Sequence, residues 1–203
     1  FAVLLNSVGT VILQSINSFH VTKVEASTLE AFKDLSIAIV SLLVAAFLTR
    51  FGIRRAIMAG FAIVAVGCVA MPLVPGFTTT KLLFLPTGIS FALVKTGTYT
   101  AIGLVTDTPS RHASLTNLIE GVFMIGVLSG YWIFGGFIDS ANPASLGWLN
   151  VYWLLAAMSL AILLGSSLGY LGLGAQPPTA EWGVLIADGK NFMTTARWMS
   201  IFP

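Results

Sequence analysis

Charged side chains inside long apolar runs are the residues of this sequence best suited to chemistry. Lys95 is the fourteenth residue of the apolar run 82–105, and Thr98 and Tyr99 follow it. On a helix, residues three and four positions apart share a face, so an ammonium, a hydroxyl and a phenol lie together. A charge at mid-membrane depth is costly, and such residues usually serve transport. Lys95 and Tyr99 are therefore predicted substrate or coupling-ion contacts. The alternatives are a structural ion pair and a lysine that reaches toward the membrane interface.

Glu120 is the predicted partner of Lys95. It lies about six residues into the apolar run 114–138, while Lys95 lies about ten residues from the inner end of its own run. At about 1.5 Å of rise per residue, the two differ in height by about 6 Å, which a lysine side chain can span. Such a pair could exchange protons or release the lysine to an anionic substrate. In the alternative, which carries equal weight, Glu120 points into a hydrated inner vestibule.

Three amides of the first apolar run, Asn6, Gln14 and Asn17, are further candidates for binding a substrate. Buried amides need hydrogen-bond partners, and sugar hydroxyls could supply them. Asn6 and Gln14 are eight residues apart and are predicted to share a face. Hydrogen bonding between helices is the more ordinary explanation for any single amide. Asp34 is expected to cap the start of the second helix, where a negative charge is favourable.

The composition places these side chains in a membrane. The 203 residues are 56% hydrophobic and 9% charged, with a net charge of +2, whereas soluble domains carry about 25% charged residues. No basic tract suggests nucleic acid. Cys68, the only cysteine, excludes a disulfide or a thiolate metal site within one chain. No cluster supports catalysis. We therefore predict a transport protein that is not an enzyme and needs no cofactor or metal.

Six apolar segments divide the chain. Each approaches the roughly 20 residues that a spanning helix needs. They cover about residues 1–19, 34–48, 56–74, 82–105, 114–138 and 148–164. The remaining stretches are predicted to be a polar connector (20–33), an outer loop (77–81) and an inner loop (106–112). The predicted fold is an all-α polytopic bundle of six spanning helices, crossing a bacterial-type inner membrane several times.

Three arginines, Arg50, Arg54 and Arg55, flank Gly52 between the second and third apolar runs. Arginine collects on the cytoplasmic side of a membrane because moving a guanidinium across the bilayer is costly. Gly52 supplies the backbone freedom of a tight turn. This stretch is predicted to be a cytoplasmic turn that forms part of an inner gate.

Residues 1–160 resemble the amino-terminal half of a major facilitator superfamily transporter. The resemblance consists of six helices, the basic turn, and the polar loop between the fourth and fifth helices. Arg50, Gly52 and Arg54 match that family's loop signature, while Thr49 stands where the family has an aspartate. The turn looks closest to the fucose-permease-like branch. The resemblance implies alternating access of a sugar-like or small organic solute at a midplane site, against a second half missing here.

The last forty residues resemble another family. Residues 171–183 (LGLGAQPPTAEWG) are similar to the segment after the fifth helix of dipeptide/oligopeptide ABC-transporter permeases, and the similarity continues to Pro203. The coupling loop that docks on the ATPase is absent, and so is a phosphate-binding loop. We therefore predict a six-helix bundle over residues 1–164 and a partly helical, permease-like tail over residues 165–203. The join falls within residues 160–169.

Two alternatives stay open. In one, the chain is a permease subunit of an ABC peptide importer, which would need an ATPase and a solute-binding protein. In the other, it is a non-functional chimeric fragment. The side of the tail is predicted from charge: an inner tail gives six basic residues inside against three outside, as the positive-inside rule favours.

Overall fold

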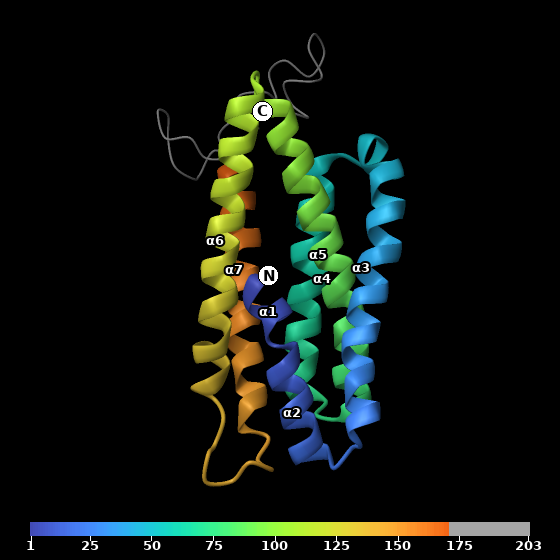
Figure 1. The fold of residues 1–203 in the computed structure, drawn as a ribbon, viewed down its shortest axis with the longest axis vertical. Coiled ribbons are helices and arrows are strands. Elements are labelled where there is room, and N and C mark those ends of the chain that lie inside the picture. Colours follow the sequence, from blue (N-terminus) through green and yellow to red (C-terminus); the bar gives the residue numbers. More distant parts are fainter. Residues whose placement is uncertain (171–203) are drawn as a thin grey trace.

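The structure, a computed structural model, describes the backbone of residues 1–170 and their side chains except at positions 45, 46, 49–51, 169 and 170. All regular elements of this part are helices (Figure 1). They are α1 (Ala2–Asn6), α2 (Val8–Phe19), α3 (Lys23–Phe51), α4 (Ile53–Leu73), α5 (Phe77–Val105), α6 (Pro109–Gly135), the short 3₁₀ helix η1 (Gly147–Asn150) and α7 (Val151–Tyr170).

The predicted all-α membrane bundle is confirmed. Within residues 1–170, four helices are long and apolar enough to cross a membrane: α4, α5, α6 and the stretch Gly147–Leu168. Helix α3 has 29 residues, but five of its first twelve are charged. Helices α1 and α2 have only 5 and 12 residues. Four of the six predicted segments therefore qualify as spanning helices on length and composition.

The predicted polar connector is wrong, because α3 already begins at Lys23. The Thr22 hydroxyl accepts a hydrogen bond from the Glu25 backbone N–H at 3.2 Å, and Glu25 Oε2 accepts one from the Thr22 backbone N–H at 2.9 Å. This reciprocal capping box satisfies two N–H groups that the first turn of a helix leaves unpaired. Asp34 consequently lies inside the helix and does not cap its start.

Local hydrogen bonds also move other predicted boundaries. The first predicted helix is divided at Ser7, whose hydroxyl donates to the Leu4 carbonyl at 2.7 Å; such back-bonding bends helices. The predicted outer loop 77–81 is the first turn of α5, where the Thr80 hydroxyl donates to the Gly76 carbonyl. The Thr108 hydroxyl caps α6, so the inner loop shortens to residues 106–108.

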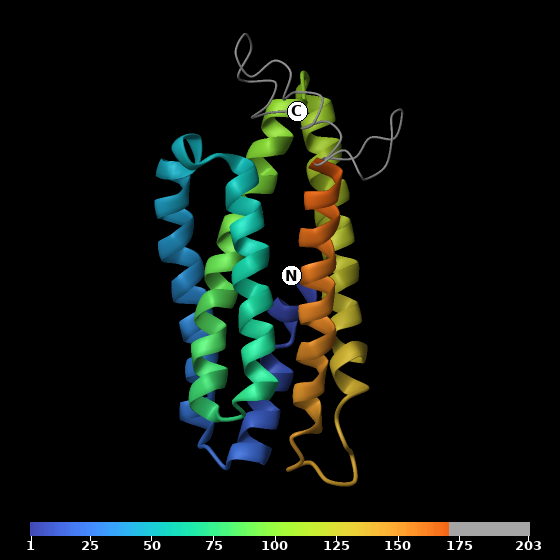
Figure 2. The same cartoon turned by 180° about the vertical axis from the view of Figure 1, so that it is seen from behind.

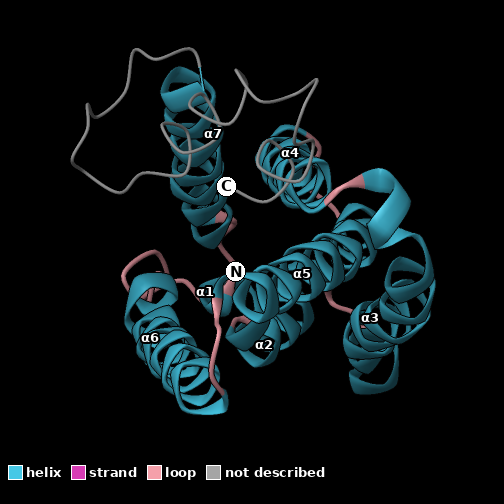
Figure 3. Ribbon diagram, turned by 90° about the horizontal axis from the view of Figure 1, so that it is seen from above, coloured by secondary structure: helices cyan, strands magenta, loops and turns pink. Residues whose placement is uncertain are grey.

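The helices form an upright bundle, and the turns and loops that connect them lie at its two ends (Figures 1 and 2). Helix α5 packs against α3 and α4, α4 also packs against α7, and α1 packs against α6. Seen end-on, α5 lies between α3 on one side and α1 and α6 on the other (Figure 3). The α3–α4 turn, the α5–α6 loop and the carboxyl end of α7 lie at one end of the bundle.

The larger hydrophobic core takes buried residues from all seven α-helices and η1, and its largest side chains come from α6, η1 and α7. Trp148, Tyr152 and Phe134 are almost fully buried in it, with the Trp148 and Tyr152 rings 6.2 Å apart. The Trp148 indole N–H donates to the Ser18 hydroxyl at 3.2 Å, which ties η1 to α2. A second, smaller core of Leu48, Ile53, Ala56 and Ala101 lies beside the α3–α4 turn.

Gly52 alone separates α3 from α4. Its φ of 89° lies in the region that favours glycine. Its N–H donates to the Leu48 carbonyl at 2.9 Å, and its carbonyl accepts from the Ala56 N–H at 3.1 Å. The predicted tight turn at Gly52 is therefore present. Arg55 is exposed and Arg54 partly exposed, whereas the Arg50 side chain lies outside the described residues.

Candidate functional site

The predicted pair of Lys95 and Glu120 is present between α5 and α6. Lys95 Nζ lies 3.8 Å from Glu120 Oε1, and the Tyr99 phenol donates a hydrogen bond to the same oxygen. Lys95 and Tyr99 are one turn apart on α5, so both side chains reach the same point on α6. The side chains of Lys95 and Glu120 are 49% and 40% exposed. They form a half-open polar cluster within an apolar bundle.

Aromatic rings surround the ammonium group. Lys95 Nζ lies 5.6 Å from the Phe91 ring centroid and 5.5 Å from the Tyr99 centroid, within the range of cation–π attraction. Phe91 in turn lies 6.0 Å from Phe123 of α6 and 6.5 Å from Phe1. The Phe91 and Tyr99 rings thus lie against the Lys95 ammonium beside the Glu120 carboxylate, and they leave the ammonium partly exposed.

Two cavities meet at Lys95. The larger, about 490 Å³, lies between α3 and α5. The smaller, about 120 Å³, lies between α5, α6 and the amino terminus, and Thr98 and Glu120 line it. Lys95, Tyr99 and Phe91 line both cavities. The cluster therefore borders a cavity on each of two sides.

Six further residues of the larger cavity were not predicted from the sequence: Ile37, Ser41, Phe91, Ala92, Thr96 and Thr100. The two threonines follow Lys95 and Tyr99 directly and share their side of α5, so the sequence did hold a signal for them. Ile37 and Ser41 come from α3, and only the packing of α3 on α5 brings them there.

The structure does not bring the predicted amides into this cluster. Asn6 donates from Nδ2 to the Val127 carbonyl of α6 at 2.7 Å, which is hydrogen bonding between helices. Gln14 is buried in α2, only 4% exposed. Neither residue lines the two cavities. Asn6 therefore meets α6 while Gln14 is buried, so the two amides have different surroundings.

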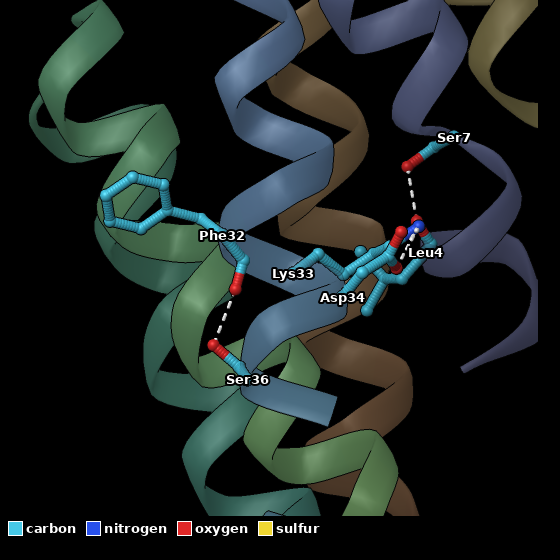
Figure 4. Close-up of polar contacts among 6 residues, drawn as sticks. All are labelled: Leu4, Ser7, Phe32, Lys33, Asp34 and Ser36. Carbon is cyan, nitrogen blue, oxygen red and sulfur yellow. Dashed lines mark hydrogen bonds and ion pairs between the residues drawn. The ribbon is translucent and has the colours of Figure 1, made fainter. Parts of the chain in front are cut away.

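A second lysine–carboxylate pair lies on α3 (Figure 4). Lys33 Nζ is 3.2 Å from Asp34 Oδ1, with the side chains 9% and 59% exposed. Figure 4 shows the pair extending toward Leu4 and Ser7, at the break between α1 and α2. The sequence reasoning missed this pair because it placed Lys33 in a connector.

Comparison with known proteins finds bacterial peptide permeases. The chain is 49% identical over 43 residues to the probable D,D-dipeptide transport system permease DdpC of Escherichia coli K12, covering 21% of this chain and 14% of that protein. It is 44% identical over 61 residues to the oligopeptide transport system permease OppC of Salmonella typhimurium, covering 30% and 20%.

A dipeptide transport system permease, DppC of Alkalihalophilus pseudofirmus, is 49% identical over 43 residues, covering 21% of this chain and 14% of its own length. The chain thus spans a fifth or less of the length of these relatives. No protein-family model matches the chain, and no solved structure matches it.

These findings support part of the predicted resemblance. The similarity to dipeptide and oligopeptide permeases is confirmed over a part of the chain, whereas the comparisons give no support for a major facilitator half. With four membrane-capable helices, they agree with a multi-pass protein of the bacterial inner membrane.

Proposed function

We propose that this chain takes part in moving a small solute across a bacterial inner membrane. The observation that carries the proposal is the cluster of Lys95, Tyr99 and Glu120, half-exposed beside two cavities in an otherwise apolar bundle. Charged groups at such depth are costly unless they are hydrated or bind something. The five residues proposed earlier for the site reduce to these three, since Asn6 and Gln14 lie elsewhere.

The permease assignment has the stronger support from relatives. Identities of 44–49% over 43–61 residues link the chain to permeases of peptide transport systems. We propose that the permease-like unit includes residues 165–203, which lie mostly outside the described residues; the matched stretches of 43 and 61 residues are longer than this segment. Under this assignment the solute is a short peptide, and the partners are an ATPase and a solute-binding protein.

The arrangement of residues 1–164 supports a second assignment, half of a secondary transporter. Exchanging the first three segments (α1–α2, α3, α4) with the last three (α5, α6, α7) carries the α1–α6 contact onto α5–α3 and leaves α4–α7 unchanged, whereas the extensive α4–α5 contact has no comparable counterpart between α7 and α1–α2. The first two correspondences are those of two inverted repeats of three helices, a plan common in secondary transporters. Under this assignment the solute is sugar-like or a small organic molecule, and the turn with Arg50, Gly52, Arg54 and Arg55 belongs to an inner gate.

Transport measurements separate the two assignments. The chain is purified from bacterial membranes with its bound partners and reconstituted in liposomes, and uptake of a labelled dipeptide and a labelled sugar is followed. Uptake that requires ATP and a co-purified ATPase supports the permease assignment, whereas uptake driven by an ion gradient alone supports the secondary transporter. Unchanged uptake in Lys95→Ala would remove the cluster from either mechanism. The absence of any uptake would support the non-functional fragment.

We also propose that the tail lies in the cytoplasm. Helix α7 ends at the same end of the bundle as the turn at Gly52 (Figure 1), where arginines collect. The test is Ala180→Cys in intact cells with a membrane-impermeant maleimide, with Ser140→Cys in the α6–α7 loop as the outer control. Labelling at position 140 but not at 180 is expected. Labelling at position 180 would place the tail outside, as the permease resemblance implies.

A further inference from the structure

The larger cavity has a charge pattern of its own. Lys95 is the one ionisable cation or carboxylate among its lining residues. Glu120 lines only the smaller cavity. A solute in the larger cavity therefore meets an ammonium group without meeting the carboxylate.

The Lys95 ammonium is available to such a solute. Its distance of 3.8 Å from Glu120 Oε1 exceeds hydrogen-bond length, so none of its three N–H donors is used by that carboxylate. The Tyr99 phenol already donates to this oxygen. Tyr99 thus holds Glu120 on the side of the smaller cavity, while Lys95 remains half-exposed.

The other lining groups indicate which further chemical groups a solute in this cavity should carry. Four of them carry hydroxyls: Ser41, Thr96, Tyr99 and Thr100. The Tyr99 phenol donates to Glu120 and the Thr100 hydroxyl donates to the Thr96 carbonyl, so these two oxygens can only accept hydrogen bonds from a ligand. Phe91, Ile37 and Ala92 supply apolar contact. A volume of about 490 Å³ falls in the range of small-molecule sites. The lining thus combines one positive charge, several hydroxyls and one aromatic ring.

We propose that this cavity binds a small hydroxylated organic anion, such as a sugar acid or a hydroxycarboxylate. Its carboxylate meets the Lys95 ammonium, and its hydroxyls meet Ser41, Thr96 and Thr100. A neutral sugar leaves the ammonium unused, and a dipeptide finds no carboxylate in this cavity for its own ammonium. The inference rests on the proposed transport function and names its solute.

Calorimetric titration of the purified chain in detergent tests this directly, with gluconate, glucose and alanyl-alanine as probes. Gluconate is expected to bind at least tenfold more tightly than the other two. Lys95→Met is expected to weaken gluconate binding at least tenfold, Lys95→Arg less than threefold, and Ser41→Ala about threefold. Lys81→Met is the matched control, because Lys81 lies on the same helix against Phe32 and Phe77, outside both cavities.

Each other outcome overturns the inference. Glucose that binds as tightly as gluconate, or gluconate binding unchanged in Lys95→Met, removes the anion requirement. Binding of alanyl-alanine alone points to a peptide. If none of the three probes binds to the folded chain, the solute class is wrong, while the uptake measurement in liposomes still decides the transport function separately. Circular dichroism of Lys95→Met, and the Lys95→Arg titration, distinguish a lost contact from a misfolded variant.

Discussion

Two lysine–carboxylate pairs among the described residues have similar chemistry and opposite surroundings. Lys33 is 9% exposed and its partner Asp34 is 59% exposed, whereas Lys95 and Glu120 are 49% and 40% exposed. Lys33 continues the buried stripe of α3 that begins with Ala26 and Leu29. Lys95 lies between two cavities. The comparison shows that packing, and not the charge pair itself, separates a structural lysine from a candidate binding residue.

The packing around Lys33 depends on the small size of Gly88 in α5. A Cβ atom added at Gly88 would lie 2.5 Å from the Lys33 carbonyl oxygen, a backbone atom that cannot move aside. Gly88→Ala is therefore expected to push α3 from α5 and to lower the free energy of unfolding by about 3 kcal/mol. Thermal unfolding in detergent, followed by circular dichroism, measures this.

The same helix offers a control. Gly103 has no atom within 4 Å of a Cβ position, so Gly103→Ala should be neutral or slightly stabilising through helix propensity. Equal losses in both variants would mean that the α3–α5 contact at Lys33 carries no special weight.

Replacing each lysine tests the comparison itself. Lys33→Ala removes a buried side chain and is expected to cost roughly 2 kcal/mol of unfolding free energy. Lys95→Ala is expected to cost less than about 1 kcal/mol, because exposed ion pairs contribute little to stability, while it abolishes binding at the larger cavity. The measurements are chemical unfolding and ligand titration on the same preparations. A larger loss of stability in Lys95→Ala would reverse the assigned roles.

A substitution at Tyr99 tests whether this residue keeps the Glu120 carboxylate away from the Lys95 ammonium. Tyr99→Phe removes the hydrogen bond to Glu120, which frees the carboxylate to compete for the ammonium. Gluconate affinity should fall about threefold to tenfold, in line with about 0.5–1.5 kcal/mol per hydrogen bond. Tyr131→Phe is the control, because Tyr131 is 71% exposed on α6. Unchanged affinity in Tyr99→Phe would show that Tyr99 does not hold Glu120 away.

The smallest expected effect is at the start of α3, which positions both Lys33 and the larger cavity. Hydrogen bonds from the Thr22 backbone and side chain lower the pKa of Glu25 from its usual value of 4.5. A carboxylate with a depressed pKa stabilises the fold above its unfolded pKa, and the contribution is lost as the pH falls through the folded value.

Glu25→Gln should therefore melt slightly below the wild type at pH 6, and the two melting temperatures should converge as the pH falls below about 4. Melting curves between pH 6 and pH 3 measure the difference. A difference that stays constant over this range would show that the charge of Glu25 does not contribute.

The sequence by itself determined the membrane bundle and the turn at Gly52, and it gave the pairing of Lys95 with Glu120 as one of two alternatives. Each follows from local chemistry: apolar length sets the helices, glycine permits the positive φ, and helical rise sets the height of two side chains. The charged residues 23–34 misled the prediction, because a polar stretch can be helical once a capping box starts it and neighbouring helices cover one face.

Only the tertiary structure decided which polar residues share a site. The packing of α3 on α5 brought Ser41 to Lys95 and buried Lys33. The packing of α1 against α6 placed Asn6 against the Val127 carbonyl, whereas Gln14 of α2 is buried. Periodicity orders side chains around one helix, but the face that meets a neighbour depends on contacts between residues far apart in the chain.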